Sequence, residues 1–329
     1  MGRTGGERAD AGRDGGWRDA RYGPGRAAPA PDADPAATGD AGAGFRLTDR
    51  APERYERYAA PVMTPFVGAL LGTVPLSPGT ALLDLACGTG FVARTAAARL
   101  AGTGSRVVGV DPAPGMLLVA AEHAVADGIV VEWQEASADD LPYANGTFDT
   151  VLCQQGVQFF PDRAAGVAEA VRVTRPGGLL GFTAWAPLGR SPFFAATGQA
   201  MEENGAGPIM DWYATAFECG ADRLSGLLTG AGLTEVTVRE VVAEVALPPL
   251  SDYVPGFMSA TPWGRAFTDA RPDDVSRGLA RVRELLAPWT TGDGSAQVEF
   301  VSYLVTGVRP ETGPDPESGT GPAPGAAAV

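Results

Sequence analysis

Apolar and polar positions alternate in blocks along the middle of the chain, where short apolar runs are separated by longer helical patterns. This arrangement predicts a doubly wound α/β fold with a mostly parallel sheet and right-handed crossovers. A helix rich in aromatic and acidic residues is expected before the sheet, from Ala51 to about Leu71. The expected strands are Ala81–Leu85, Arg106–Asp111, Val130–Gln134, Phe148–Cys153, Leu179–Trp185, Thr234–Ala246 and Gln297–Val308.

The two ends of the chain differ in composition from its middle. Residues 1–44 are mainly Gly, Ala, Arg, Asp and Pro, and residues 310–329 are mainly Pro, Gly and Ala. Such segments have too few aliphatic side chains to bury, so we expect disordered tails on either side of one domain at residues 45–309. The N-terminal segment lacks the apolar core of a secretory signal, and no apolar run approaches the roughly 20 residues that span a bilayer.

Charge and cysteine content limit the class of partner. The formal net charge is −14, and no basic cluster is visible in the central part of the chain, so nucleic acid is not expected as a partner. The three cysteines are Cys87, Cys153 and Cys219, which match no metal-binding spacing and suit a reduced cytoplasm. We therefore expect a cytoplasmic protein with a small-molecule partner, no metal and no membrane insertion, and the oligomeric state stays open.

The most informative run is LLDLACGTGF at residues 82–91. Apolar strand residues lead into a glycine turn and then a helical pattern, which is typical of the first unit of a nucleotide-binding sheet. Gly88 and Gly90 would let the backbone pass close to a ligand where a Cβ would collide. The next strand ends at Asp111, 21 residues after Gly90, where a carboxylate can accept hydrogen bonds from ribose hydroxyls.

Two kinds of nucleotide fit this unit. The spacing of Gly88, Gly90 and Ala93 satisfies the dinucleotide fingerprint, so a nicotinamide or flavin enzyme is one interpretation. A pyrophosphate, however, prefers a helix N-terminus without competing negative charge. Asp84 lies four residues before the first glycine. Its carboxylate would repel a pyrophosphate and attract a cation, and S-adenosylmethionine carries an ammonium and a sulfonium.

The same run resembles motif I of the class I S-adenosylmethionine-dependent methyltransferases, in the form common in their small-molecule (type 11-like) branch. Segments similar to three further family motifs follow in the family's order, at Glu135–Tyr143, Asn145–Cys153 and Val173–Gly178. The resemblance implies a Rossmann-like seven-stranded sheet with an antiparallel last strand, and S-adenosyl-L-methionine as cofactor. The cofactor-binding residues that it implies are Tyr55, Asp84, Ala86, Gly88, Gly90, Asp111, Pro112, Met116, Ser137, Ala138 and Gln154.

One residue departs from the family pattern. Relatives usually carry Asp in the adenine loop where this chain has Ser137, so the contact to the adenine amino group differs. The backbone amide of the neighbouring Ala138 is still placed to bond a ring nitrogen.

The sequence leaves the catalytic residues unknown. The only histidine, His123, lies on the helix after Asp111 and belongs to the cofactor half, so we do not expect it to be a base. Methyl transfer can draw much of its rate from placement alone, and the lack of an obvious base favours an acceptor that is already nucleophilic, or a phenol served by a tyrosine or by water. The candidates are Gln155, Gln158 and Tyr58. Their structural alternatives are a polar loop before a helix cap for the glutamines, and packing on the sheet for the tyrosine.

Two segments are longer than simple connections require, at residues 186–220 and 248–294. Ligands of open α/β sheets bind outside the carboxyl ends of the strands, so we interpret these segments as the wall and lid of an acceptor pocket. The alternative is that their aromatic side chains pack in an ordinary core. These aromatics are Phe193, Phe194, Trp212, Tyr213, Phe217, Tyr253, Phe257, Trp263, Phe267 and Trp289.

Together these features predict an S-adenosylmethionine-dependent methyltransferase that acts on a small, largely apolar acceptor. The aromatic segments point to bacterial specialised metabolism by analogy alone. Three alternatives stay open: a quinone or lipid methyltransferase of primary metabolism, a non-catalytic scaffold that keeps the cofactor pocket, and a nicotinamide oxidoreductase.

Overall fold

The computed structural model describes residues 50–311, apart from residues 206, 262 and 265–271. The tail expected at residues 1–44 therefore lies outside the described residues, as does the one expected at residues 310–329 apart from its first two residues. Seven strands form one sheet with the order β3-β2-β1-β4-β5-β7-β6. β7 is antiparallel to both of its neighbours, and the other pairings are parallel. The strands are β1 (Ala81–Leu85), β2 (Arg106–Asp111), β3 (Glu132–Glu135), β4 (Phe148–Gln154), β5 (Thr174–Trp185), β6 (Thr234–Leu247) and β7 (Ala296–Val308).

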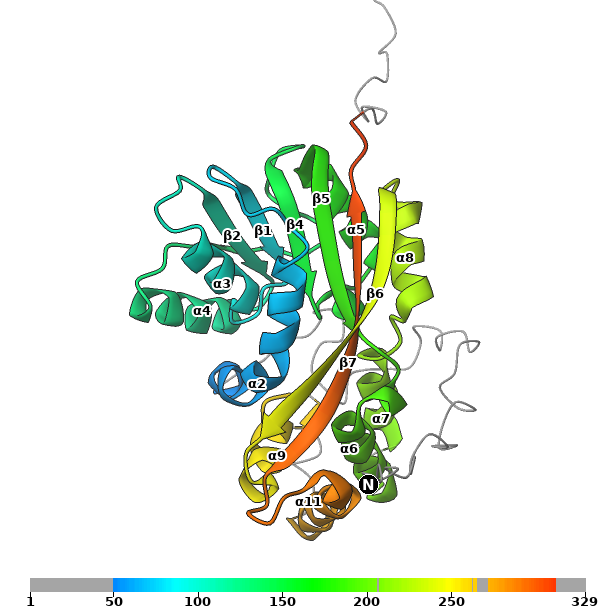
Figure 1. The fold of residues 1–329 in the computed structure, drawn as a ribbon. Helices are drawn as coiled ribbons and strands as arrows, with labels where there is room; N and C mark the ends of the chain where they lie inside the picture. The colour runs from blue at the N-terminus through cyan, green and yellow to red at the C-terminus, as the bar shows by residue number, and fades with distance from the viewer. Residues whose placement is uncertain (1–49, 206, 262, 265–271, 312–329) are drawn as a thin grey trace, which may run out of the picture.

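Helices connect these strands and confirm the doubly wound α/β fold (Figure 1). The α-helices are α2 (Ala51–Leu71), α3 (Phe91–Arg99), α4 (Pro114–Ala126), α5 (Arg163–Val173), α6 (Pro192–Glu203), α7 (Gly207–Thr215), α8 (Ala221–Gly230), α9 (Leu250–Ser259) and α11 (Pro272–Leu285). Within the described part of the chain, no helix is both long and apolar enough to cross a membrane.

The alternation of side chains along β1 explains how its two faces are used. Leu82 packs with side chains of α2 and α3 on one face of the sheet, whereas Leu83 and Leu85 pack with α5 and α8 on the other. Successive side chains of a strand point to opposite faces, so Asp84 lies on the same face as Leu82. A carboxylate is therefore directed toward the beginning of α3.

β6 and β7 extend well beyond the rest of the sheet and carry a second packed region, which we name the appended lobe (Figure 1). It consists of α6, α7, α9, α11 and the adjoining ends of the two long strands. Its core is aromatic and includes Phe193, Tyr253, Phe257 and Phe300. The lobe lies beneath the carboxyl ends of β4 and β5, where an α/β sheet binds its ligands.

The expected and observed bounds differ mainly at two strands. β3 begins at Glu132 rather than Val130, whose side chain is 87% exposed at the edge of the sheet. β5 begins at Thr174 rather than Leu179, because Thr174 already pairs with Phe148 before an irregularity in the register. Neither difference moves the carboxyl end of a parallel strand by more than one residue.

Candidate active site

A cavity of about 540 Å³ opens at the carboxyl ends of the parallel strands. This volume lies within the range of roughly 300–1,000 Å³ that is typical of small-molecule sites. The ends of β1, β2 and β3 and their loops form what we name the acidic half, which includes Asp84, Gly88, Asp111, Glu135 and Ser137. Phe159, β5 and the appended lobe form what we name the aromatic half, which includes Trp185, Phe194, Tyr213, Phe217, Phe257 and Trp263.

The described lining residues include three carboxyl side chains, Asp84, Asp111 and Glu135, and no basic one. All three belong to the acidic half. A cavity of this kind attracts a cationic ligand and repels a pyrophosphate. The electrostatics thus favour S-adenosylmethionine over a dinucleotide.

Asp84 is a buried carboxyl without a cationic partner. Its side chain is 1% exposed, and its Oδ2 accepts a hydrogen bond of 2.9 Å from the backbone N–H of Ala93 in the first turn of α3. Burial raises the pKa of Asp84 to about 8, and the negative charge of Asp111 adds to the rise. Within the described residues, no Arg side chain forms an ion pair with Asp84. A cationic ligand group in the cavity would supply a positive charge next to the Asp84 carboxylate.

Asp111 fastens the glycine loop to the end of β2. Its Oδ2 accepts a hydrogen bond of 2.8 Å from the N–H of Gly88, and its Oδ1 accepts one of 2.9 Å from the N–H of Ala113. A carboxylate has about four acceptor positions, which is more than these two bonds occupy. Asp111 can therefore hold the loop and bind a ribose at the same time.

The two glycines of the loop have different surroundings. Gly88 has a φ of +56° and lines the cavity, and an added Cβ would lie 3.3 Å from Cε of Met116. Gly90 has a φ of +83°, but it is not among the lining residues, and an added Cβ would lie 2.5 Å from the ring of Trp133. Gly90 thus makes room for a side chain of β3, and its contact with a ligand stays a prediction.

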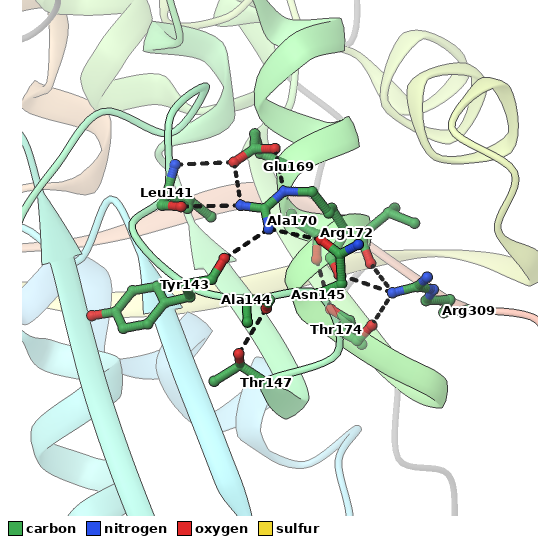
Figure 2. A network of polar contacts seen from close by, with 11 residues as sticks. Leu141, Tyr143, Ala144, Asn145, Thr147, Glu169, Ala170, Arg172, Thr174 and Arg309 are labelled. Carbon is green, nitrogen blue, oxygen red and sulfur yellow. Dashed lines mark hydrogen bonds and ion pairs between the residues drawn. The ribbon is translucent and has the colours of Figure 1, made fainter. Parts of the chain in front are cut away.

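The loop after β3 contributes Ser137 and Ala138 to the cavity wall. The Ser137 hydroxyl donates a hydrogen bond to Asp139. A polar network that extends to the C-terminal end of β7 holds the following residues of this loop against α5 (Figure 2). In it, Glu169 accepts a bond of 3.0 Å from the N–H of Leu141, and Arg172 donates to the Leu141 carbonyl at 3.0 Å. The network fixes the loop from the side away from the cavity.

Arg172 links further groups to this network. Its guanidinium donates to the carbonyl of Tyr143 at 2.7 Å and to Oδ1 of Asn145 at 2.9 Å, while it is paired with Glu169 at 2.6 Å (Figure 2). Arg309 donates to the carbonyls of Arg172 and Thr174 at the end of the same helix.

Two glutamines follow one another at the end of β4, and both line the cavity. Nε2 of Gln154 donates a hydrogen bond of 2.9 Å to the carbonyl of Met63 on α2. Nε2 of Gln155 donates one of 2.8 Å to the hydroxyl of Ser302 on β7. Gln158 is 1% exposed and lies outside the cavity lining, so the structure does not bring this candidate to the site.

The tyrosines of α2 have different positions. Tyr55 lines the acidic half, and its ring stacks on Phe91 with 6.4 Å between the ring centroids. Tyr58 is not a lining residue; it packs edge-on against Tyr253, whose hydroxyl donates a 2.7 Å bond to the Tyr58 carbonyl. His123 does not line the cavity either, and its Nε2 lies 3.9 Å from Glu56 on α2.

The remaining expected cofactor residues, Ala86, Pro112 and Met116, all line the acidic half. Ala86 and Gln155 have positive φ values of 55° and 53°, which no local sequence pattern predicts. Both follow a strand directly, at neighbouring positions in the sheet. Such conformations are costly for residues other than Gly and are typical of functional sites.

Both long segments contribute side chains to the aromatic half, in line with the interpretation of them as wall and lid. Several of their aromatic side chains, however, do not line the cavity. Phe193 and Tyr253 are fully buried in the core of the appended lobe, and Trp289 is 38% exposed. Phe267 and the side chain of Trp212 lie outside the described residues. The lining rings contact one another in a continuous chain that joins Trp185, Phe194, Phe217, Tyr213, Trp263 and Phe159.

Comparison with known proteins identifies relatives of this chain. A family model described as "Methyltransferase domain" matches residues 83–182, which contain β2, β3 and β4 and most of β1 and β5. An uncharacterised protein of Mycobacterium tuberculosis is 35% identical over 187 residues, which is 55% of this chain and 67% of that protein. A ubiquinone biosynthesis O-methyltransferase of a Methylobacterium species is 35% identical over 127 residues, or 39% of this chain and 44% of that enzyme.

Solved structures share the fold. The YcgJ protein of Bacillus subtilis is similar with a TM-score of 0.50 at 17% identity, over 75% of this chain and 98% of that one. A phosphoethanolamine N-methyltransferase of Haemonchus contortus, solved with S-adenosylhomocysteine, has a TM-score of 0.52 at 18% identity, over 80% of this chain and 58% of that one. At these identities the likeness concerns the fold.

Proposed function

This chain belongs to the class I S-adenosylmethionine-dependent methyltransferases, and on that premise we propose that it methylates a small, largely apolar acceptor. The cofactor is S-adenosyl-L-methionine, which supplies an electrophilic methyl group on a sulfonium when it is bound. The observation that carries the proposal is one cavity in which an acidic half meets an aromatic half. We place the reaction in bacterial specialised metabolism on the strength of the long aromatic segments alone.

The acidic half fits the cofactor in charge. The buried Asp84 lacks a positive partner within the described residues, so it suits the cationic methionine end. Asp111 has acceptor capacity for the ribose hydroxyls, and Ser137 and Ala138 lie where the adenine would bind. Tyr55 on α2 would cover the cofactor from the solvent side.

The aromatic half fits a neutral acceptor. None of the described residues that line it carries a formal charge, and its one titratable side chain is Tyr213. The Tyr213 hydroxyl donates to the Phe194 carbonyl at 2.9 Å, and burial raises its pKa well above the usual range. Tyr213 is therefore no base at neutral pH. The chain's contribution to the reaction is placement of the nucleophile and exclusion of water.

A second candidate acceptor is a quinone precursor. Two of the named relatives, from Methylobacterium and Hahella chejuensis, are ubiquinone biosynthesis O-methyltransferases, and the chain spans about half of their length or less. A prenylated catechol would also suit an aromatic cavity. The two candidates differ in whether the acceptor carries a long isoprenoid tail.

The test is calorimetry of the full chain with S-adenosylhomocysteine and, separately, with NADH, followed by an assay of S-adenosylhomocysteine release. The assay compares phenols, amines, carboxylic acids and a prenylated catechol as acceptors. We expect binding of S-adenosylhomocysteine, no heat with NADH, and turnover with a neutral aromatic acceptor. Binding of NADH without S-adenosylhomocysteine would contradict the proposal.

A further inference from the structure

Gln155 has features that a connecting loop does not require. Its φ is +53°, which strains any residue other than Gly, and its side chain is 5% exposed. The backbone N–H lies 3.1 Å from both the carbonyl and the hydroxyl oxygen of Thr183 on β5, so the strained conformation is held from two positions. The residue lines the cavity, and its Oε1 is buried without a hydrogen-bond partner.

The hydrogen bonds of Ser302 determine whether Nε2 or Oε1 of the Gln155 amide faces the Ser302 hydroxyl. The Ser302 hydroxyl lies 2.9 Å from the carbonyl oxygen of Ala184 and 3.3 Å from that of Tyr303, and it donates its single hydrogen to one of these two carbonyls. It can therefore only accept from Gln155, and the group that faces it at 2.8 Å is the amide nitrogen. Oε1 of Gln155 is consequently directed away from Ser302.

The same contact locates the amide within the cavity. Gln155 follows β4, but its side chain reaches Ser302 on β7, which pairs with Trp185 on β5. In the sheet order, β5 and β7 lie on the side of β4 opposite to β1, so the amide extends away from β1, where the acidic half begins. Gln155 therefore belongs to the wall of the aromatic half.

The side-chain hydroxyl groups described in that wall form hydrogen bonds within the protein. The Tyr213 hydroxyl bonds with Phe194 and Thr197, and the Thr261 hydroxyl donates to the Met258 carbonyl while it accepts from the N–H of Gly264. Buried acceptors in proteins nearly always have a partner, so a lone one at a ligand cavity indicates that a ligand provides the donor.

We infer that Gln155 is a specificity-determining residue that accepts a hydrogen bond from a hydroxyl group of the acceptor, and that the acceptor class is a neutral hydroxylated aromatic compound. The inference rests on the proposed function, because it assigns the aromatic half to the acceptor. The ring chain from Trp185 to Trp263 provides faces and edges for an aromatic ring, and Oε1 distinguishes a hydroxylated ring from a bare one.

The experiment compares two probes of equal size. 1-Naphthol and 1-methylnaphthalene are titrated calorimetrically into the full chain, with and without saturating S-adenosylhomocysteine. A purely apolar wall would favour 1-methylnaphthalene, because burial of an unpaired hydroxyl is costly. With Gln155 as acceptor, we expect 1-naphthol to bind about tenfold tighter.

The decisive variant is Gln155→Met. Methionine has a side chain of similar length and the same strain at a positive φ, but it has no Oε1. We expect the tenfold preference to fall to about one or to reverse, while the Kd of S-adenosylhomocysteine changes by less than about twofold. Gln297→Met is the matched control, since Gln297 is exposed on β7 and lies outside the cavity lining, and it should keep the preference.

Three results would overturn the inference: a wild-type protein that prefers 1-methylnaphthalene, a Gln155→Met variant that keeps the wild-type preference, or a Gln155→Met variant that loses S-adenosylhomocysteine instead. The wild-type comparison decides even where the variant does not fold. Failure of the wild-type protein to bind S-adenosylhomocysteine would contradict the proposed function separately, and the probe ratio measured without that ligand would still test Gln155.

Discussion

The acidic and the aromatic halves of the cavity are built in different ways. The acidic half comes from three successive strand ends and the loops that follow them. Its carboxylates bond to backbone in the same stretch of chain, as Asp84 does with Ala93 and Asp111 with Gly88. The aromatic half is assembled from β5, α6, α7 and α9, and its one polar side chain with an unpartnered buried oxygen is held by a residue 147 positions away. The polar contacts of the acidic half are thus encoded locally, whereas those of the aromatic half depend on packing between distant segments.

The largest expected effect is in the acidic half. Gly88→Val places a branched side chain at a φ of +56°, in the cavity and against Met116. We expect the affinity for S-adenosylhomocysteine to fall by more than about 100-fold, since both the strain and the occupied volume oppose binding. Calorimetry measures the change.

Gly79→Val is the matched control for that substitution. Gly79 also has a positive φ, of +81°, but an added Cβ there has no heavy atom within 4 Å. It should lower the Tm and leave the affinity unchanged. Equal losses of affinity in the two variants would mean that Gly88 acts through stability alone.

Asp111→Ala should have the next largest effect. The substitution removes the acceptor of two loop hydrogen bonds and of the proposed ribose contacts. We expect the affinity for S-adenosylhomocysteine to fall by roughly 10- to 150-fold, as for hydrogen bonds to a charged group. Asp149→Ala is the control, because Asp149 also accepts a backbone N–H bond, from Ala81 at the opposite end of β1. Unchanged affinity in Asp111→Ala would show that the end of β2 is not part of the cofactor site.

In the aromatic half, Phe217→Ala should weaken the use of the acceptor without weakening the binding of the cofactor. Phe217 lines the cavity, and loss of its ring should raise the acceptor KM by roughly 10- to 100-fold with little change in S-adenosylhomocysteine affinity. Trp263→Ala should raise the acceptor KM in the same way.

Phe193→Ala is the informative counterpart, since Phe193 is fully buried in the core of the appended lobe and does not line the cavity. Its truncation should cost about 3–5 kcal/mol of stability. Measuring the Tm and the acceptor kinetics of each variant distinguishes a packing role from a role in the cavity. A lower Tm with unchanged acceptor kinetics for Phe217→Ala would assign that ring to packing.

The smallest expected effect is a change in the pH dependence of stability. Burial raises the pKa of Asp84 from 3.8 to about 8, so the folded protein binds a proton that the unfolded chain releases. The resulting contribution to stability is complete below about pH 4, decreases as the pH rises and is lost by about pH 8.

Asp84→Asn should remove this decline, because the amide stays neutral. We expect the Tm of the ligand-free variant at pH 8 to exceed that of the wild type by a few degrees. Its affinity for S-adenosylmethionine should be lower, because the amide carries no charge. A variant that shows the same fall in Tm between about pH 4 and pH 8 as the wild type would show that another group is responsible.

Much of the sheet could be predicted from the sequence, since the relevant information is local. The apolar run that ends in Leu85, and the one that ends in Asp111, have the predicted bounds. α2 also begins and ends as expected. That Gly90 makes room for Trp133 could not be predicted, because Trp133 belongs to a strand about 40 residues later whose packing no local pattern reveals.

The aromatic half could be predicted only in outline. The long segments indicated a pocket, but neighbouring rings have opposite roles: Phe194 lines the cavity and Phe193 fills the core. Adjacent helical residues point in directions about 100° apart, so the choice between them depends on where the helix packs. The role proposed for Gln155 depends on Ser302, and no spacing in the sequence connects the two.

The central claim is that the two halves hold two ligands at once. The most direct measurement is calorimetric titration of 1-naphthol into the full chain, first alone and then saturated with S-adenosylhomocysteine. If the acidic half holds the cofactor and the aromatic half the acceptor, the Kd of 1-naphthol will be unchanged or lower in the presence of S-adenosylhomocysteine. An apparent Kd that rises in proportion to the S-adenosylhomocysteine concentration would show that the two ligands compete for one place, and would contradict the division of the cavity.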